Sequence, residues 1–314
     1  MAKPNWIVRI VLTLTLLLAG TADALAKYKV AFLPSTTTQP LTRAWQQSIG
    51  FTLKWKLIEL QSFDPAMKAA TQVTMMNDLI DQKYDTIILQ PIDAAQIEES
   101  VKRAEAQGIH IITLNTNIRH PHAAHVTMDD FGAGSLVGEN IGKSLNGQGS
   151  VAIIQSPQGA IAGVERERGF RETLGSKFPN IKIVAAQNGE WRKDSAVEVM
   201  KGFLKTYQQI DAVFAVNDAM AEGAMMAAEA SGRLDKIRIW GFNGQKSTLT
   251  LIEEGKITGS AYTNAYQQGS TAAMRAIELL TGKRAKAAIT ETITIPPFPA
   301  TRETVGQIQQ IDRW

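Results

Sequence analysis

Side chains that can both donate and accept hydrogen bonds follow many of the strand-like runs of this sequence. The run "IITL" ends at Asn115, "VFAV" ends at Asn217, "IWGF" ends at Asn243 and "SAYT" ends at Asn264. Amides offer both donors and acceptors, and a buried polar group without a partner costs on the order of 1–3 kcal/mol. A set of such groups therefore suits a small ligand that is rich in hydroxyls.

Turn chemistry is the simpler explanation for any one of these residues. Asn, Asp and Ser cap helices and tolerate turn conformations, and Asp218 in particular can cap the helix that follows it. Turn chemistry explains less well why amides outnumber Gly and Asp at nearly every strand end. The pattern as a whole favours a ligand site.

The elements that must position these side chains are short β-branched runs separated by longer segments of helical period. The runs that we interpret as strands cover residues 29–33, 55–60, 86–89, 109–114, 124–128, 150–155, 181–186, 212–216, 237–242, 258–262 and 291–295. Repeated strand–helix–strand units predict an α/β fold with parallel sheets and helices on both faces. So many strands suit two doubly wound sheets better than one, and ligands bind outside the carboxyl ends of such strands.

Composition excludes several functions. The chain has 314 residues, enough for two domains, and no cysteine, which rules out disulfides, thiolate metal sites and cysteine catalysis. The formal net charge is only +3, and no basic stripe carries interleaved aromatic residues. We therefore expect no nucleic-acid partner.

The first 26 residues are typical of a secretory signal peptide. Lys3 and Arg9 precede the apolar run 10–19, and Ala24 and Ala26 supply the small residues of a cleavage site. A membrane anchor is the alternative, but the run is shorter than the roughly 20 residues that span a bilayer. We expect cleavage after Ala26 and an exported, soluble mature protein.

From Tyr28 to about Leu280 the chain resembles the periplasmic sugar-binding proteins of the ribose- and galactose-binding type. The segments that carry the resemblance are "QPIDAAQIEESVKRAEAQGIHIITLN", "VERERGF", "AVFAVNDAMAEGAM", "IRIWGFNG" and "LIEEGKITGSAYTN". The resemblance implies the type I periplasmic binding protein fold, in which two doubly wound parallel-sheet lobes, joined by a three-strand hinge, enclose a ligand. The expected lobes are residues 27–128 plus 263–288 and residues 129–262 plus 289–314.

The family's contact positions carry over one at a time. Gln39 matches a polar contact, Asn115 stands where an Asp-Arg pair is usual, and Asn243 replaces a common aspartate. Arg168, the second arginine of "ERER", matches the ligand-binding arginine. The ligand-binding residues that we predict are Gln39, Trp45, Asn115, Arg168, Trp191, Asn217, Asn243 and Asn264.

Two of these residues are aromatic. Trp191 sits where the family has an aromatic residue, and either Trp191 or Trp45 would cover the C–H face of a sugar ring. Two carboxylates of the family are amides here, which indicates a ligand other than ribose. Arg168 has no obvious carboxylate partner, so a sugar acid is one hypothesis; a neutral sugar or polyol is favoured.

The resemblance implies a periplasmic solute-binding component of an ABC importer, acting as a monomer without a cofactor and delivering its ligand to an inner-membrane permease. The alternative is a periplasmic sensing accessory of a receptor kinase or chemoreceptor. We do not expect an enzyme, because no nucleophile elbow is present and the strand ends hold amides where a glycosidase needs two carboxylates.

Two further patterns have simple explanations. The glycines of "FGAGSLVG" (131–138) resemble a dinucleotide-binding loop, but small residues at a packed helix start are the better interpretation. The histidines of "HPHAAH" (120–125) match no familiar zinc-ligand spacing, so a loop between strands is favoured over a metal site.

Overall fold

The computed structural model describes residues 28–283, 290–308 and 313, and divides into two compact units. Unit 1 holds the described residues of 28–127 and 266–293, and unit 2 holds those of 128–265 and 294–314. The chain therefore passes from one unit to the other three times. The predicted signal peptide, residues 1–26, lies outside the described residues.

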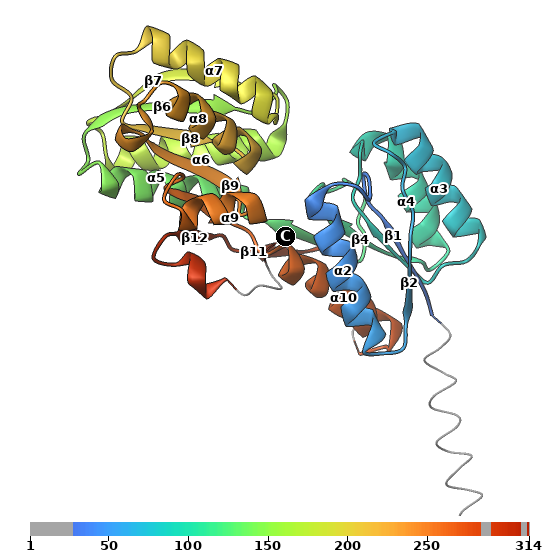
Figure 1. Cartoon of the computed structure of the whole chain (residues 1–314). Coiled ribbons are helices and arrows are strands. Elements are labelled where there is room, and N and C mark those ends of the chain that lie inside the picture. Colours follow the sequence, from blue (N-terminus) through green and yellow to red (C-terminus); the bar gives the residue numbers. More distant parts are fainter. Residues whose placement is uncertain (1–27, 284–289, 309–312, 314) are drawn as a thin grey trace, which may run out of the picture. The chain divides into compact units, whose positions relative to one another are not determined.

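Unit 1 is built on one six-stranded sheet with the order β11-β5-β4-β3-β1-β2. The strands are β1 (Lys29–Leu33), β2 (Glu59–Ser62), β3 (Thr86–Leu89), β4 (His110–Leu114), β5 (Ala124–Met128) and β11 (Glu291–Ile295). The helices are α2 (Pro40–Lys54), α3 (Ala69–Asp81), α4 (Ala94–Ala106) and α10 (Ala265–Leu280). Strands β1 to β5 pair in parallel, and α2 lies beside α10 while α3 lies beside α4 (Figure 1).

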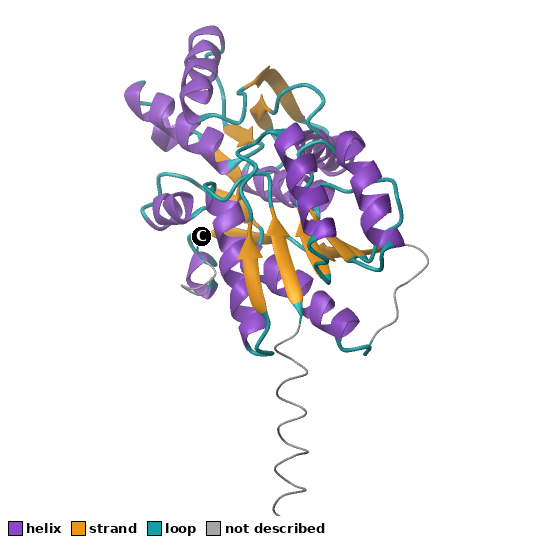
Figure 2. Ribbon diagram, turned by 90° about the vertical axis from the view of Figure 1, so that its right-hand side faces the viewer, coloured by secondary structure: helices purple, strands orange, loops and turns teal. Residues whose placement is uncertain are grey.

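Unit 2 repeats this plan with the order β12-β10-β9-β8-β6-β7. The strands are β6 (Gly149–Gln155), β7 (Ile181–Asn188), β8 (Ala212–Ala215), β9 (Arg238–Asn243), β10 (Gly259–Tyr262) and β12 (Phe298–Thr301). The helices are α5 (Asp130–Ser144), α6 (Ile161–Lys177), α7 (Lys193–Thr206), α8 (Asp218–Ala230) and α9 (Lys246–Glu253), with short 3₁₀ turns at Leu234–Lys236 and Val305–Gln307. Helices flank the strands (Figure 2), which confirms the predicted α/β fold of two doubly wound sheets.

Two strand predictions are corrected by the structure. The run 55–60 does not form a strand at its start, because Trp55 ends α2 and Leu57 turns left-handed at φ 56°. The amide of Ile58 then donates to the carbonyl of Leu53 at 3.2 Å, which closes the helix end. Strand β12 was missing from the prediction because it contains Pro299, and it pairs antiparallel with β10 at the sheet edge, where a proline is tolerated.

The glycines of the segment 131–138 bring α5 against α6. A Cβ atom at Gly134 would lie 1.8 Å from the carbonyl oxygen of Arg166, and one at Gly169 would lie 2.1 Å from that of Phe131. Neither contact is possible for a larger residue, so these glycines permit the two helix backbones to touch. This confirms the helix-packing interpretation of "FGAGSLVG".

Two of the three clustered histidines of unit 1, His122 and His125, share the hydroxyl group of Thr113. His122 Nε2 and His125 Nδ1 lie 2.8 and 2.9 Å from Oγ1 of Thr113, and both side chains are buried. Desolvation by burial lowers the pKa of His125 to about 4. The described residues hold no group of three or more His, Cys, Asp or Glu side chains placed to bind a metal ion.

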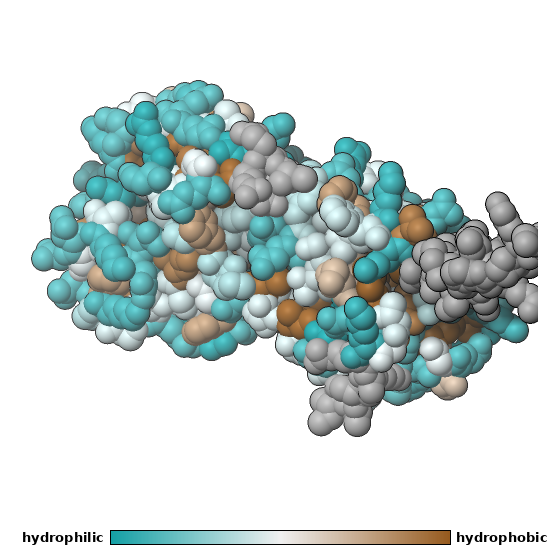
Figure 3. Space-filling model, turned by 90° about the horizontal axis from the view of Figure 1, so that it is seen from below, coloured by the Kyte–Doolittle hydropathy of each residue, from teal (hydrophilic) through white to brown (hydrophobic). Residues whose placement is uncertain are grey.

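Figure 3 shows one face of the molecule, on which hydrophilic residues predominate. The large exposed apolar side chains include Phe51, Trp55 and Leu57 at the end of α2, and Met67 after β2. Across the described residues, no helix has both the length and the apolar character that a membrane crossing requires.

Candidate functional site

Arg166 lies at the centre of a cluster at the carboxyl ends of the unit 2 strands. Its Nε donates to Oδ1 of Asp130 at 2.8 Å, and its Nη1 donates to the carbonyl of Val216 at 2.9 Å. Its Cζ lies 3.4 Å from the ring centroid of Phe242 and 5.6 Å from that of Trp191. The guanidinium is thus fixed in position, and its Nη2 has no hydrogen-bond partner among the described residues.

Arg168, the arginine predicted from the sequence, lies outside this cluster. Its guanidinium pairs with Glu165 at 2.6 Å and with Glu172 at 3.0 Å on the exposed face of α6, and stands 4.2 Å from the ring of Phe131. Two residues along an α-helix is a rotation of about 200°, so Arg166 and Arg168 point in nearly opposite directions. The structure therefore places Arg166, and not Arg168, in the cluster, and Arg168 has carboxylate partners that the sequence did not reveal.

Trp191 and Asn217 lie beside Arg166 and are joined by a hydrogen bond. Asn217 caps α8, where its Oδ1 accepts from the amide of Met220 at 2.8 Å, and its Nδ2 donates to the carbonyl of Trp191 at 3.2 Å. A Cβ atom at Gly163 would lie 2.9 Å from Cη2 of Trp191, so this glycine leaves room for the indole above α6. The structure therefore brings both predicted residues to the cluster.

Asn243 and Asn264 end neighbouring strands of the same sheet. Asn243 follows Phe242, has φ 116°, and accepts from the amide of Thr263 through its carbonyl at 3.1 Å. Both asparagine side chains are half-buried. Their places at the carboxyl ends of β9 and β10 are those that the sequence predicts for a ligand site.

Unit 1 holds three of the predicted residues, and two of them, Gln39 and Asn115, are at least partly exposed. Gln39 is exposed at the start of α2 and makes no side-chain cap bond. Asn115 is half-buried after β4 with φ 58°, and its Oδ1 accepts from Nε2 of Gln268. Both remain candidate contacts.

Trp45 is a core residue of unit 1. Its side chain is 0% exposed, and its Nε1 donates to Oε1 of Gln268 at 2.8 Å. A Cβ atom at Gly269 would lie 3.0 Å from the carbonyl oxygen of Trp45, so α10 covers it closely. The indole has no free face for a ligand, and we remove Trp45 from the predicted site.

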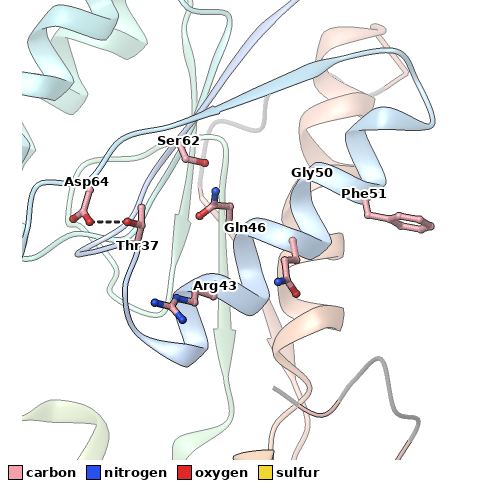
Figure 4. Close-up of a pocket in the computed structure, with 8 residues that line it drawn as sticks. Thr37, Arg43, Gln46, Gly50, Phe51, Ser62 and Asp64 are labelled. Carbon is pink, nitrogen blue, oxygen red and sulfur yellow. Dashed lines mark hydrogen bonds between the residues drawn. The ribbon is translucent and has the colours of Figure 1, made fainter.

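A groove of about 620 Å³ between α2 and β2 includes residues that sequence reasoning missed. Figure 4 shows Thr37 and Asp64 facing each other at one end of it, with Arg43 and Gln46 along α2. Oγ1 of Thr37 donates to Oδ2 of Asp64 at 2.6 Å, and this hydrogen bond lowers the pKa of Asp64. Asp64 therefore adds a carboxylate at the carboxyl edge of unit 1, and it is not among the ligand-binding residues predicted from the sequence.

Comparison with known proteins identifies the family. Residues 30–284 match the model of the periplasmic binding protein domain. The chain belongs to this family. The described part of the match includes both sheets' parallel strands and the whole Arg166 cluster.

Relatives of this periplasmic binding protein include characterised sugar and polyol binders. The xylitol-binding protein of Mycolicibacterium smegmatis is 31% identical over 69% of this chain and 62% of its own length. The ribose import binding protein of Bacillus subtilis is 26% identical over 86% of both chains. A periplasmic solute-binding protein of an ABC transporter from Actinobacillus succinogenes, solved with bound D-allose, has a TM-score of 0.81 at 26% identity and covers 90% of this chain and 100% of its own.

Asp218 adds a buried carboxyl group behind the site of this periplasmic binding protein. Its Oδ1 accepts from Oγ of Ser260 at 2.7 Å, and its Oδ2 accepts from the amide of Gln245 at 2.6 Å. Its side chain thus joins the start of α8 to β10 and to the residue that precedes α9. Burial, which outweighs these hydrogen bonds, raises the pKa of Asp218 to about 7.

We expect this group to make stability fall as the pH rises. A carboxyl whose folded pKa is raised stabilises the fold fully below its unfolded pKa of about 4, and this stabilisation is lost as the pH rises through about 7. Urea unfolding between about pH 4.5 and 8 should show the free energy of unfolding of the wild type falling relative to Asp218→Asn, by at most about 1.4 kcal/mol per pH unit. The histidines are present in both proteins, so their contribution to the pH dependence cancels in the difference. A difference that does not change with pH would contradict the raised pKa.

Proposed function

We propose that this periplasmic binding protein is the solute-binding component of an ABC importer and that its ligand is a neutral sugar or polyol. The observation that carries the proposal is the Arg166 cluster. A fixed guanidinium with a free Nη2 stands beside the indole of Trp191 and the amide of Asn217. Donors beside an aromatic face suit a ring or chain that bears hydroxyls on apolar carbons.

The charge balance favours a neutral ligand over a sugar acid. Asp130 already pairs with Arg166 at 2.8 Å, and Glu165 and Glu172 pair with Arg168. Neither arginine needs an anionic ligand to balance its charge. The sugar-acid hypothesis rested on an Arg168 without carboxylate partners, and that premise does not hold.

We further propose the cellular setting. The protein is exported by a signal peptide cleaved after Ala26, acts as a monomer, and binds its ligand with residues of both units, including Gln39 and Asn115 of unit 1. Closing of the units on the ligand is the common response in such proteins, and the closed form would engage an inner-membrane permease. The names of the relatives favour this transport role over a sensing role. They also favour binding of the ligand over its chemical conversion.

The test is a thermal-shift screen of the chain from residue 27 against xylitol, D-ribose and D-allose, with sugar acids as the matched anionic set. A ligand at 100 times its dissociation constant should stabilise the protein by roughly 2.7 kcal/mol, which is a shift of about 5–10 °C for domains of this size. We expect a neutral compound to produce the shift. A response to sugar acids alone, or to no compound, would contradict the proposal.

A further inference from the structure

Two loops, one in each unit, have the same backbone pattern after corresponding strands. Strand β2 is the edge strand beside β1 in unit 1, and β7 is the edge strand beside β6 in unit 2. Each is followed by two consecutive left-handed residues that are not glycine: Ala66 (φ 51°) and Met67 (φ 60°) in unit 1, Glu190 (φ 55°) and Trp191 (φ 60°) in unit 2.

The turn that begins each loop is held by the same side-chain hydrogen bond. Oδ1 of Asp64 accepts from the amide of Ala66 at 2.8 Å, two residues along the chain. Oδ1 of Asn188 accepts from the amide of Glu190 at 2.7 Å, also two residues along. An Asp or Asn side chain that mimics a backbone turn in this way is a local device, and it occupies the same position in both loops.

The backbone bonds that follow also correspond. The amide of Lys68 donates to the carbonyl of Pro65 at 3.0 Å, and that of Arg192 donates to the carbonyl of Gly189 at 3.0 Å. Helix α3 begins two residues after Met67, and α7 begins two residues after Trp191. The loops are therefore counterparts in an internal structural repeat, and Met67 occupies the position of Trp191.

The conformation of Met67 is costly, and its side chain is left in solvent. A left-handed residue other than glycine costs roughly 1–2 kcal/mol, and such strain clusters at ligand sites. The amide of Met67 donates to the carbonyl of Ser35 at 2.8 Å, which fixes the backbone, yet 54% of the residue is exposed. The packing of unit 1 thus covers less than half of this residue, which lies at the carboxyl edge beside Asp64.

We infer that Met67 is a specificity-determining contact for the ligand, the unit 1 counterpart of Trp191. The inference rests on the proposed function, because it requires a sugar or polyol with apolar C–H surface at the carboxyl ends of the strands. A thioether chain is flexible and polarisable and adapts to an irregular apolar surface. Met67 covers such a surface of the ligand with a shape that an aromatic ring does not offer.

The experiment is calorimetric titration of xylitol, D-ribose and D-allose into the wild type and three variants. Met67→Ala should bind about tenfold more weakly, because it loses apolar contact, and Met67→Leu should stay within about threefold of the wild type. The matched control is Met274→Ala, which removes a methionine on α10 that is 49% exposed. We expect it to bind as the wild type does.

Two different results would overturn the inference, and they can be told apart by whether the wild type binds a compound. If the wild type binds one of these compounds and Met67→Ala binds it as tightly as Met274→Ala, the inference fails while the proposed function stands. If the wild type binds none of them, the proposed function fails and the inference fails with it. Melting temperatures of the variants show whether each remains folded.

Discussion

Arg166→Ala should lower the free energy of unfolding by about 3 kcal/mol, because it removes a buried cation and leaves the partly buried carboxylate of Asp130 without its partner. The side chain of Arg166 is 9% exposed and that of Asp130 is 22% exposed. The substitution also removes the donor to the carbonyl of Val216 and the cation over the ring of Phe242. Burial already raises the pKa of Asp130, and loss of Arg166 should raise it further. Urea unfolding at neutral pH measures the effect.

Arg168→Ala is the matched control, because it removes the same side chain from the same helix. The Arg168 side chain is 48% exposed, and exposed ion pairs contribute little to stability. We expect its unfolding midpoint to stay close to that of the wild type and its sugar binding to be unchanged. Equal destabilisation by the two substitutions, or a larger effect of Arg168→Ala, would show that Arg166 is not the central arginine.

Gln268→Leu should destabilise unit 1 by about 2–4 kcal/mol through the polar groups that it leaves unpaired. Gln268 is 0% exposed; its Oε1 accepts from Trp45 Nε1 at 2.8 Å, and its Nε2 donates to the carbonyl of Val126 at 3.2 Å. Leucine has a similar shape but no polar atoms. The control is Gln107→Leu, because Gln107 is exposed at the end of α4 and its side chain has no hydrogen bond to another described residue.

A double-mutant cycle separates the two buried bonds. In a Trp45→Phe background the indole N–H is already gone, so Gln268→Leu should cost less there than in the wild type. If Gln268→Leu lowers the free energy of unfolding equally in both backgrounds, the hydrogen bond between Trp45 and Gln268 does not stabilise the packing of α2 against α10. Gln268→Leu also removes the donor to Oδ1 of Asn115, so part of its cost comes from that hydrogen bond.

The difference between Arg166 and Arg168 shows what sequence reasoning could have found. Gly163, Arg166, Gly169 and Phe170 are all buried in α6, and their spacing is that of one helix face. The helical period of "GVERERGF" therefore already indicates that Arg166, and not Arg168, lies on the buried face of the helix. The resemblance to a family pointed to α6, but to a residue on its exposed face.

Other features could not be predicted because they depend on residues far apart in the sequence. Trp45 is buried by Gln268, a residue 223 positions away. A cap role for Asp218 was the alternative explanation of its position, but Asn217 is the cap, and Asp218 accepts from Ser260, which lies 42 positions away. Strand periodicity acts locally, which is why the parallel sheets were predicted correctly.

The central claim is that a neutral sugar or polyol binds at the cluster of Arg166, Trp191 and Asn217. The most direct measurement is calorimetric titration of xylitol, D-ribose and D-allose into the chain from residue 27, for the wild type and for Asn217→Ala. Losing the cap should cost only about 1 kcal/mol of stability, so the variant should remain folded. The account predicts that at least one compound binds the wild type in a 1:1 complex and that Asn217→Ala abolishes or greatly weakens this binding. No binding by any of the three compounds, or binding that Asn217→Ala leaves unchanged, would contradict it.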